Sequence, residues 1–211
     1  MSETSQPTRF WRSFLARMTP GLVGLVVSSL SLEPSRGQMG LGLTQNGPLE
    51  RVQVLGSALL SYATDHDGAY PTGKSSTEIF QQLIDQKYIT DPSVVWFALP
   101  GKTKPASMTL KPENVCWDVT VPVDGNAPDA LPVVFCTGYK LTYAAAGTAT
   151  PLFPVSDNRP RGIAVSYHSQ RAVFLRETSA TDRTVNNVIP GSFDAGGKQY
   201  QQLTPDGPLA P

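Results

Sequence analysis

The chain has 211 residues, and its 17 basic and 17 acidic residues cancel to a net charge of zero. A neutral chain lacks the general electrostatic attraction that draws a protein to nucleic acid or to an anionic membrane surface, so nucleic acid is not expected among its partners. Hydrophobic residues make up 40% of the chain, enough for one domain with its own core. Its 18 glycines and 19 prolines favour short elements separated by turns over a bundle of long helices.

Residues 1–37 are typical of a targeting segment. Three arginines within 9–17 precede an apolar run over 21–32, as in the charged and hydrophobic parts of a signal peptide. The run of about 12 residues falls short of the roughly 20 that span a bilayer as a helix, and Glu33-Pro34 ends it. We therefore expect a signal peptide, with an uncleaved N-terminal anchor as the alternative. The protein is then exported to the periplasm, to the periplasmic side of the inner membrane, or out of the cell.

The remaining chain predicts one domain with flexible flanks. Residues 38–47 are rich in glycine and polar side chains and predict a linker. The domain itself is expected over 48–190. Residues 191–211 are again polar and glycine-rich, which predicts a flexible tail.

The first half of the domain predicts two helices. Apolar residues recur at three- and four-residue spacing over 52–63, the period of one helix face, and Pro48 suits a first helical position. Gly68 can take the left-handed conformation that ends such a helix near Asp67. The motif Ser75-Ser-Thr-Glu78 is a capping box and begins a second helix of about ten residues.

The second half shifts to the period of two that marks β-strands. Strands are expected over 115–121 and 133–143, the latter bent or divided at Gly138. Residues 144–161 predict a loop, and 162–175 predict a β-hairpin. Helices followed by strands predict an α+β domain, in which an N-terminal spine helix and a short second helix pack on a small antiparallel sheet.

Two cysteines, Cys116 and Cys136, lie within the expected strands. In an exported protein a disulfide between them closes a loop of about 20 residues and stabilises the fold by about 3 kcal/mol. Neighbouring strands bring their Cα atoms near the bonding distance, so we expect this disulfide, with two buried thiols as the alternative. Two cysteines without a nearby histidine are too few for a structural zinc site.

The end of the first helix carries a family resemblance. The stretch Ala58-Leu-Leu-Ser-Tyr-Ala-Thr-Asp-His-Asp-Gly-Ala-Tyr-Pro-Thr72 resembles the end of the stalk helix in type II secretion major pseudopilins and related type IV pilin-like proteins. The late hairpin resembles one near the end of those domains. The resemblance implies a pilin-like fold, with a small antiparallel sheet packed on the stalk helix. The motif residues are Tyr62, Asp65, Asp67, Gly68, Tyr70 and Pro71.

The N-terminus departs from that family. Pilin-like proteins carry a glycine followed by Phe-Thr-Leu-Ile-Glu at the start of the apolar stretch, and this chain lacks that prepilin processing motif. We therefore expect a non-enzymatic, exported, pseudopilin-like protein that acts through protein–protein contacts. Other pseudopilin-like subunits are candidate partners, and a type II secretion or pilus-like system is the candidate setting. The alternative is a soluble periplasmic protein that reuses the fold to bind a glycan or calcium, or to act as a hydrolase.

Oxygen ligands for calcium are scarce. Asp65-x-Asp67-Gly68 begins like an EF-hand loop, but Ser76 stands where the acid at the twelfth position belongs. Helix termination explains the motif without an ion. Calcium binding through late oxygen-bearing residues stays an alternative, and these are Asp157, Asn158, Asp182 and Asn187.

Side chains for catalysis or glycan binding are also few. The two histidines, His66 and His168, lie at expected turns, and no Gly-x-Ser-x-Gly motif supplies a nucleophile. No catalytic residue and no cofactor is therefore assigned. Aromatic residues on the expected strands predict core packing or, alternatively, a glycan-binding face; they are Trp117, Phe135, Tyr139 and Tyr143.

Overall fold

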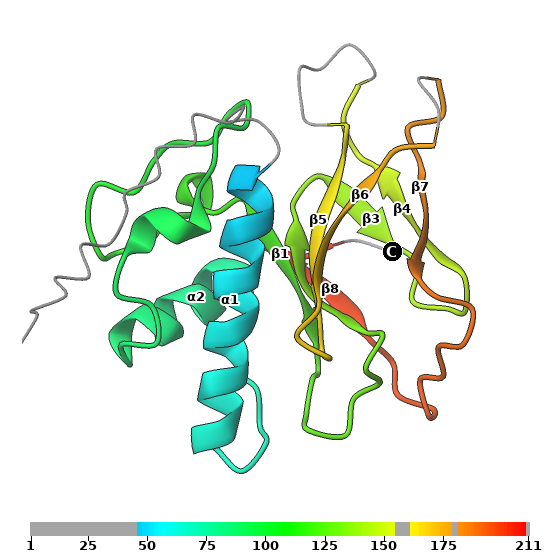
Figure 1. Ribbon diagram of the computed structural model, residues 1–211. Coiled ribbons are helices and arrows are strands. Elements are labelled where there is room, and N and C mark those ends of the chain that lie inside the picture. Colours follow the sequence, from blue (N-terminus) through cyan, green and yellow to red (C-terminus); the bar gives the residue numbers. More distant parts are fainter. Residues whose placement is uncertain (1–45, 155–160, 179–180, 210–211) are drawn as a thin grey trace, which may run out of the picture. The chain divides into compact units, whose positions relative to one another are not determined.

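The computed structural model describes residues 46–154, 161–178 and 181–209 (Figure 1). The expected targeting segment and most of the expected linker lie outside these residues, as do the calcium candidates Asp157 and Asn158. The described residues form helices first and strands after them. The α+β class expected from the sequence is confirmed.

The strands form two antiparallel sheets instead of one small sheet. The larger sheet has the order β6-β5-β2-β1-β8-β9 and the smaller one has the order β3-β4-β7. In chain order the strands are β1 (Trp117–Val121), β2 (Pro132–Cys136), β3 (Tyr139–Leu141), β4 (Gly147–Pro151), β5 (Gly162–Tyr167), β6 (Ala172–Arg176), β7 (Val185–Ile189), β8 (Gln201–Thr204) and β9 (Gly207–Pro208).

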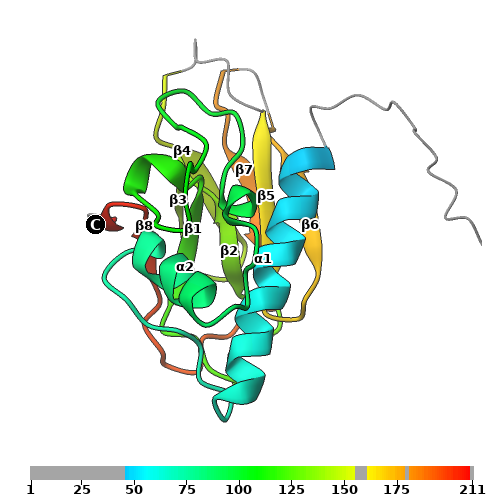
Figure 2. The same cartoon turned by 90° about the vertical axis from the view of Figure 1, so that its left-hand side faces the viewer.

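Helix α1 (Asn46–Asp65) packs on one face of the larger sheet, against β2, β5 and β6 (Figure 2). Its buried side follows the expected stripe, with Val52, Leu55 and Leu59 almost fully enclosed. Burying each such side chain contributes about 1.5–3 kcal/mol. Gly56 lets the helix approach closely, because a Cβ at this position would lie 2.1 Å from the Ser166 Oγ on β5.

The end of α1 has the hydrogen bond of a Schellman turn. The amide of Gly68 donates to the carbonyl of Ala63 at 2.8 Å, and both Asp67 and Gly68 have positive φ, 53° and 83°. The helix therefore ends at Asp65, two residues earlier than expected, because the left-handed turn already begins at Asp67.

Helix α2 (Ser76–Asp85) begins where the capping box predicts. The hydroxyl of Ser75 accepts a hydrogen bond from the Glu78 amide at 3.2 Å. The Glu78 carboxylate reaches one residue beyond the cap and accepts from the Lys74 amide at 2.7 Å. Two short 3₁₀ helices follow, η1 (Pro92–Val95) and η2 (Pro112–Asn114).

The expected strands are partly confirmed. The hairpin over 162–175 is present as β5 and β6. The segment over 133–143 divides at Gly138, which has φ 94°, so that β2 and β3 belong to different sheets. The expected loop over 144–161 contains β4, whose small residues Gly-Thr-Ala-Thr-Pro give little strand signal.

The expected flexible tail over 191–211 is wrong for the described part of that segment. Strand β8 pairs with β1 in register, Leu203 opposite Val119, and both Gln202 and Leu203 are buried. A polar stretch becomes an inner strand because the sheet and a buried carboxyl group supply partners for its polar groups. The domain extends to at least β9.

The domain has three layers, visible side by side in Figure 1: the helices, the larger sheet and the smaller sheet. Hydrogen bonds join the two sheets at two places. The Tyr167 hydroxyl on β5 donates to the Val188 carbonyl on β7 at 2.6 Å, and the Gln202 amide on β8 contacts β3. The main core lies between α1, α2 and the larger sheet and includes Trp117 and Phe135, both fully buried.

Candidate functional site

The two cysteines are buried thiols, which corrects the expected disulfide. The structure describes both residues, and no disulfide joins them. The register places Trp117, not Cys116, opposite Cys136, so the two sulfurs are offset by one residue along the strands. The Cys116 thiol hydrogen-bonds the backbone of Phe97 instead, with its sulfur 3.3 Å from the Phe97 carbonyl oxygen. Burial raises the pKa of Cys136 to about 12, which makes it an unreactive thiol.

The family-motif residues hold the turn after α1 in place. The Asp65 carboxylate accepts a hydrogen bond from the Tyr88 hydroxyl at 2.8 Å. The Tyr62 ring stacks on His66 with centroids 3.9 Å apart. The carbonyl of Gly68 accepts from the Gly125 amide at 3.0 Å, which joins the turn to the loop after β1.

The last two motif residues, Tyr70 and Pro71, are buried. Burial raises the pKa of the Tyr70 hydroxyl, and its ring lies 5.8 Å from that of His168. The motif therefore connects α1 to the sheet region. It assembles no set of ligands or reacting groups.

The aromatic residues considered for glycan binding are not exposed on a face of the sheet. Trp117 and Phe135 are fully buried, and Tyr139 is 2% exposed. The fourth aromatic residue, Tyr143, is half-buried with its hydroxyl 2.8 Å from that of Thr120. A sugar can stack only on an exposed ring, so these residues are core and not a binding surface.

The calcium candidates within the described residues do not form a cluster. Asp182 accepts a hydrogen bond from the Thr184 hydroxyl at 2.8 Å, whereas Asn187 lies on β7. Nowhere in the described ranges do three His, Cys, Asp or Glu side chains come close enough together to hold a metal ion.

One carboxyl group, that of Asp118 on β1, is fully buried. Its Oδ2 accepts a hydrogen bond from Gln202 Nε2 at 2.6 Å, and the same amide nitrogen donates to the Tyr139 carbonyl at 2.6 Å. Burial raises the pKa of Asp118 to about 7, and hydrogen bonds from Thr137 and Gln202 offset this effect only in part. A perturbed acid can mark a catalytic site, but neither hollow described below is lined by Asp118. Its role is to join β1 and β8 to the smaller sheet.

A buried ion pair joins Glu177 to Arg183. The Arg183 Nε lies 3.1 Å from Glu177 Oε2, with both side chains almost fully enclosed. The Tyr139 hydroxyl donates to Glu177 Oε1 at 2.9 Å, and the guanidinium lies 4.7 Å from the centre of the Phe153 ring. This ion pair joins the residue that follows β6 to the residues that precede β7.

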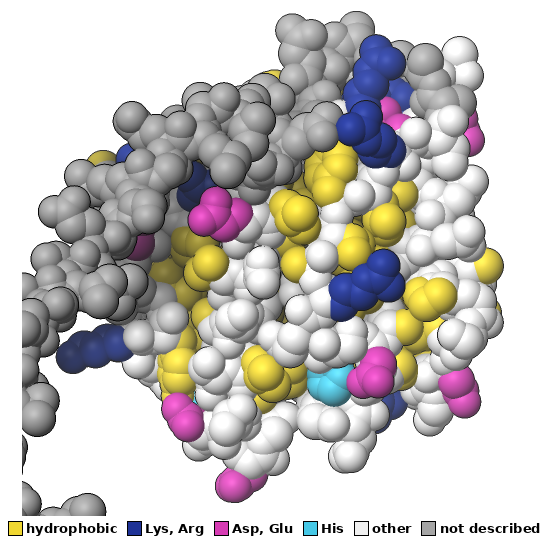
Figure 3. Space-filling view, in the orientation of Figure 1, with side chains coloured by type: hydrophobic (Ala, Val, Ile, Leu, Met, Phe, Trp, Pro, Cys, Tyr) yellow, Lys and Arg dark blue, Asp and Glu magenta, His cyan; other side chains and the backbone are white. Residues whose placement is uncertain are grey.

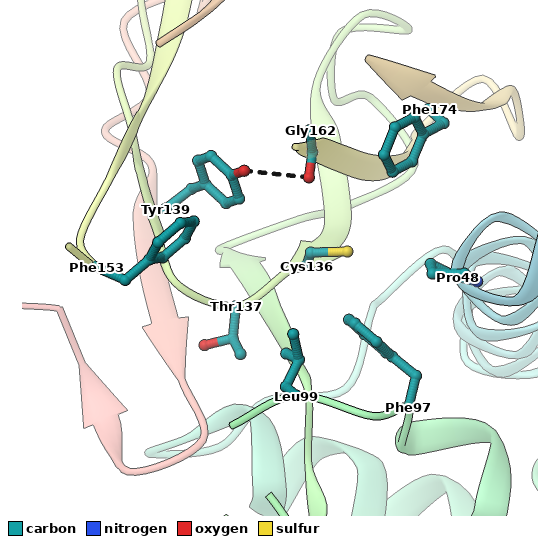
Figure 4. Close-up of a pocket in the computed structure, with 9 residues that line it drawn as sticks. All are labelled: Pro48, Phe97, Leu99, Cys136, Thr137, Tyr139, Phe153, Gly162 and Phe174. Atoms are coloured by element: carbon teal, nitrogen blue, oxygen red, sulfur yellow. Dashed lines mark hydrogen bonds between the residues drawn. The ribbon is translucent and has the colours of Figure 1, made fainter. Parts of the chain in front are cut away.

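A small cavity lies where α1 begins, beside the end of β2 (Figure 4). Figure 4 shows the Cys136 sulfur pointing into the space between Pro48, Phe97 and Phe174. The cavity volume is about 10 Å³, which is room for about one water molecule. It cannot hold a substrate.

A larger, open groove lies between β6 and β7. Val173 and Leu175 of β6 and Tyr167 of β5 line one side, and Asn187 and Pro190 line the other. Its volume is about 260 Å³, below the roughly 300–1,000 Å³ of pockets that enclose small molecules. This size suits a few side chains of a contacting protein.

The face over this groove carries apolar side chains and charges of both signs, since Arg171 and Asp129 both line the groove. Figure 3 shows hydrophobic side chains over β6 and toward β7, with Lys or Arg side chains among them. Strand β6 is the last strand of the larger sheet, and its four apolar residues, 172–175, are all partly exposed. Natural edge strands are usually short, charged or covered, because an exposed apolar edge can pair with another chain. The β6 edge together with the groove is therefore the candidate functional site.

Sequence reasoning missed this edge. In the hairpin, Ile163 and Val165 of β5 are buried, whereas Val173 and Leu175 of β6 are partly exposed and line the groove. A signal was present in the sequence, since arginines stand immediately before and at the end of the apolar run, as charges often flank aggregation-prone strands.

No family model, no curated protein and no solved structure matches the chain. The resemblance to pseudopilins therefore rests on the motif over 58–72 and on the hairpin. None of the helices within the described residues is both long enough and apolar enough to cross a membrane.

Proposed function

We propose that the chain is an exported, pseudopilin-like protein that has no enzymatic activity and works by binding other proteins. The observation that carries the proposal is the apolar β6 edge, which has a groove beside it and no described strand paired along its outer side. A partly exposed apolar strand at a sheet edge favours contact with another protein chain.

The pilin-like part of the proposal has separate support. Helix α1 ends in the Asp-Gly-x-Tyr-Pro turn that carries the resemblance, and an antiparallel sheet packs against it. Partners of this class include other pseudopilin-like subunits, at a type II secretion or pilus-like assembly. Export places the domain in the periplasm or on the periplasmic side of the inner membrane.

Photo-crosslinking in cells that make the protein tests the contact. A benzoylphenylalanine replaces Leu175 in the β6 groove, and a control chain carries it at Lys140, an exposed position on β3. We expect one defined protein adduct from position 175 and none from position 140. Equal adducts from both positions, or none from either, contradict the proposed contact face.

The start of the mature chain tests export. Sequencing the N-terminus of the protein from fractionated cells should give a start near Gln38. An intact N-terminus in the membrane fraction supports the anchored alternative, and an intact N-terminus in the cytoplasm contradicts export.

A further inference from the structure

We propose that the partner contributes an extended segment that adds beside β6 as a further strand, with an acidic residue next to Arg171. This inference rests on the proposed function and names the chemistry of the partner. Three features of the described domain support it: backbone groups directed outward, a groove for alternate side chains, and the charge at the end of the strand.

The backbone of β6 has hydrogen-bonding groups directed away from β5. The Tyr167 amide donates to the Arg171 carbonyl at 2.9 Å, so these two residues form a hydrogen-bonded pair. Hydrogen-bonded and non-hydrogen-bonded pairs alternate along an antiparallel ladder. The next pair, Ser166 with Ala172, is therefore non-hydrogen-bonded, and the N–H and C=O of Ala172 point outward. By the same alternation those of Phe174 do too.

The groove accommodates the side chains of an added strand. Val173 and Leu175 point to the groove side of β6, while Phe174 points to the α1 side, toward Pro48 (Figure 4). Side chains of a strand alternate between the two faces of the sheet. An added strand would place every second side chain into the groove of about 260 Å³, so apolar residues at alternate positions suit it. Backbone pairing then supplies affinity and the groove supplies selectivity.

Charge distinguishes among possible occupants. Arg171 is exposed, immediately before β6, and Arg176 ends the strand. The Arg171 side chain lies on the groove side of β6 with Val173 and Leu175, and opposite charges directly across two strands are stabilising. Asp129 also lines the groove, from the loop before β2. A strand with an acidic residue opposite Arg171 therefore fits this edge, and sedimentation separates it from a second copy of this chain.

The other sheet edges fit less well. Strand β9 has only two residues, and β3 has three with Lys140 exposed between buried neighbours. Strand β7 carries two exposed asparagines, Asn186 and Asn187. Among the described edges, β6 alone combines five residues with an apolar run.

Two labelled peptides test the proposal by fluorescence anisotropy with the full chain at low salt, where exposed charges are least screened. The first is fluorescein-Glu-Thr-Val-Thr-Val-Thr-Glu-amide, in which both glutamates and both valines point to one face of the strand, and the second carries lysine in place of both glutamates. Because both ends are acidic, the first peptide can reach Arg171 in either strand direction. We expect it to bind at least about tenfold more tightly than the lysine peptide.

Two variants and one control locate the binding. Arg171→Glu changes an exposed side chain and should reverse the preference between the peptides. Ala172→Pro removes an outward N–H and should weaken both peptides about tenfold, the loss of roughly one hydrogen bond. Lys140→Glu changes the net charge by the same amount as Arg171→Glu on another sheet, and should behave as the unmodified chain.

Each other outcome overturns the proposal. Equal binding of the two peptides, an unchanged preference in Arg171→Glu, or a reversed preference in Lys140→Glu contradicts the charged strand. If Ala172→Pro fails to fold, the reversal in Arg171→Glu decides alone. A dimer in sedimentation that Ala172→Pro abolishes makes a second copy the occupant. If neither peptide binds, strand addition is rejected. A photo-adduct at position 175 in that case still supports the proposed function. If there is neither peptide binding nor a photo-adduct, both the strand addition and the proposed function are rejected.

Discussion

Replacing Asp118 by asparagine should make the domain more stable at pH 8 and leave its stability at pH 4 nearly unchanged. The carboxyl group is fully buried on β1 and accepts one hydrogen bond from Gln202. An asparagine side chain has nearly the same shape and keeps an oxygen for that hydrogen bond. It cannot ionise, however, so it removes the cost of a buried charge.

The magnitude follows from the pKa of Asp118. Burial raises it from 3.8 to about 7, which corresponds to a free energy on the order of 4 kcal/mol. Because the folded chain holds the proton more tightly than the unfolded chain, this contribution is complete below about pH 4. As the pH rises from about 4 to about 7, the carboxyl group ionises in the unfolded chain while it stays protonated in the folded chain. The unfolded chain is thereby stabilised, and the contribution to folding is lost. At pH 8 the variant should therefore exceed the unmodified chain by up to about 4 kcal/mol.

Urea unfolding, followed by tryptophan fluorescence at pH 4.5, 6 and 8, measures the difference. The free energy of unfolding of the variant should exceed that of the unmodified chain by about 1 kcal/mol at pH 4.5, and the difference should grow to its full value by pH 8. Asp85→Asn, which removes an exposed carboxylate from α2, is the matched control. A difference between Asp118→Asn and the unmodified chain that stays constant from pH 4.5 to pH 8 would refute the reasoning.

Three further predictions concern packing, a buried charge and a thiol. Gly56→Ala should lower the free energy of unfolding by about 1–3 kcal/mol, because the new methyl group meets the Ser166 hydroxyl. In a Ser166→Ala background the loss measured by urea unfolding should be smaller, and an equal loss in both backgrounds rejects the close approach. Glu177→Gln should lower the free energy of unfolding by about 3–5 kcal/mol, since the buried guanidinium of Arg183 loses its carboxylate. A chain with both Glu177→Gln and Arg183→Met should recover most of this loss when thermal stability is measured. Cys136 should resist iodoacetamide at pH 8 in the folded protein and react once unfolded, because its pKa is about 12 in the fold; intact mass showing alkylation of Cys136 in the folded protein, or a species about two daltons lighter, contradicts the buried thiol.

Local signals in the sequence determined the helices and the hairpin. Apolar spacing and a left-handed turn set α1, and a serine with a glutamate three residues later set the start of α2. Alternation around the turn at 168–170 set β5 and β6. Each of these signals acts within a few residues, so a reader of the sequence alone can find it.

The candidate site depended on which strands meet, and local signals do not carry that information. Strand β6 reads as half of a hairpin in the sequence, and only its place at the end of the sheet order exposes its apolar residues. The cysteines read as a disulfide, but the register offsets them by one residue. One residue of register changes which side chains face each other.

The sequence by itself determined that this chain is an α+β protein with two helices and a late hairpin. The tertiary structure decided that its polar end is an inner strand, that Asp118 is a buried acid and that β6 is an open edge. Gln202 illustrates the physical reason. It reads as a solvated residue, yet it is buried because Asp118 on β1 and the backbone of β3 satisfy its amide. Burial of a polar group is decided by partners far away in the chain, and only folding brings them together.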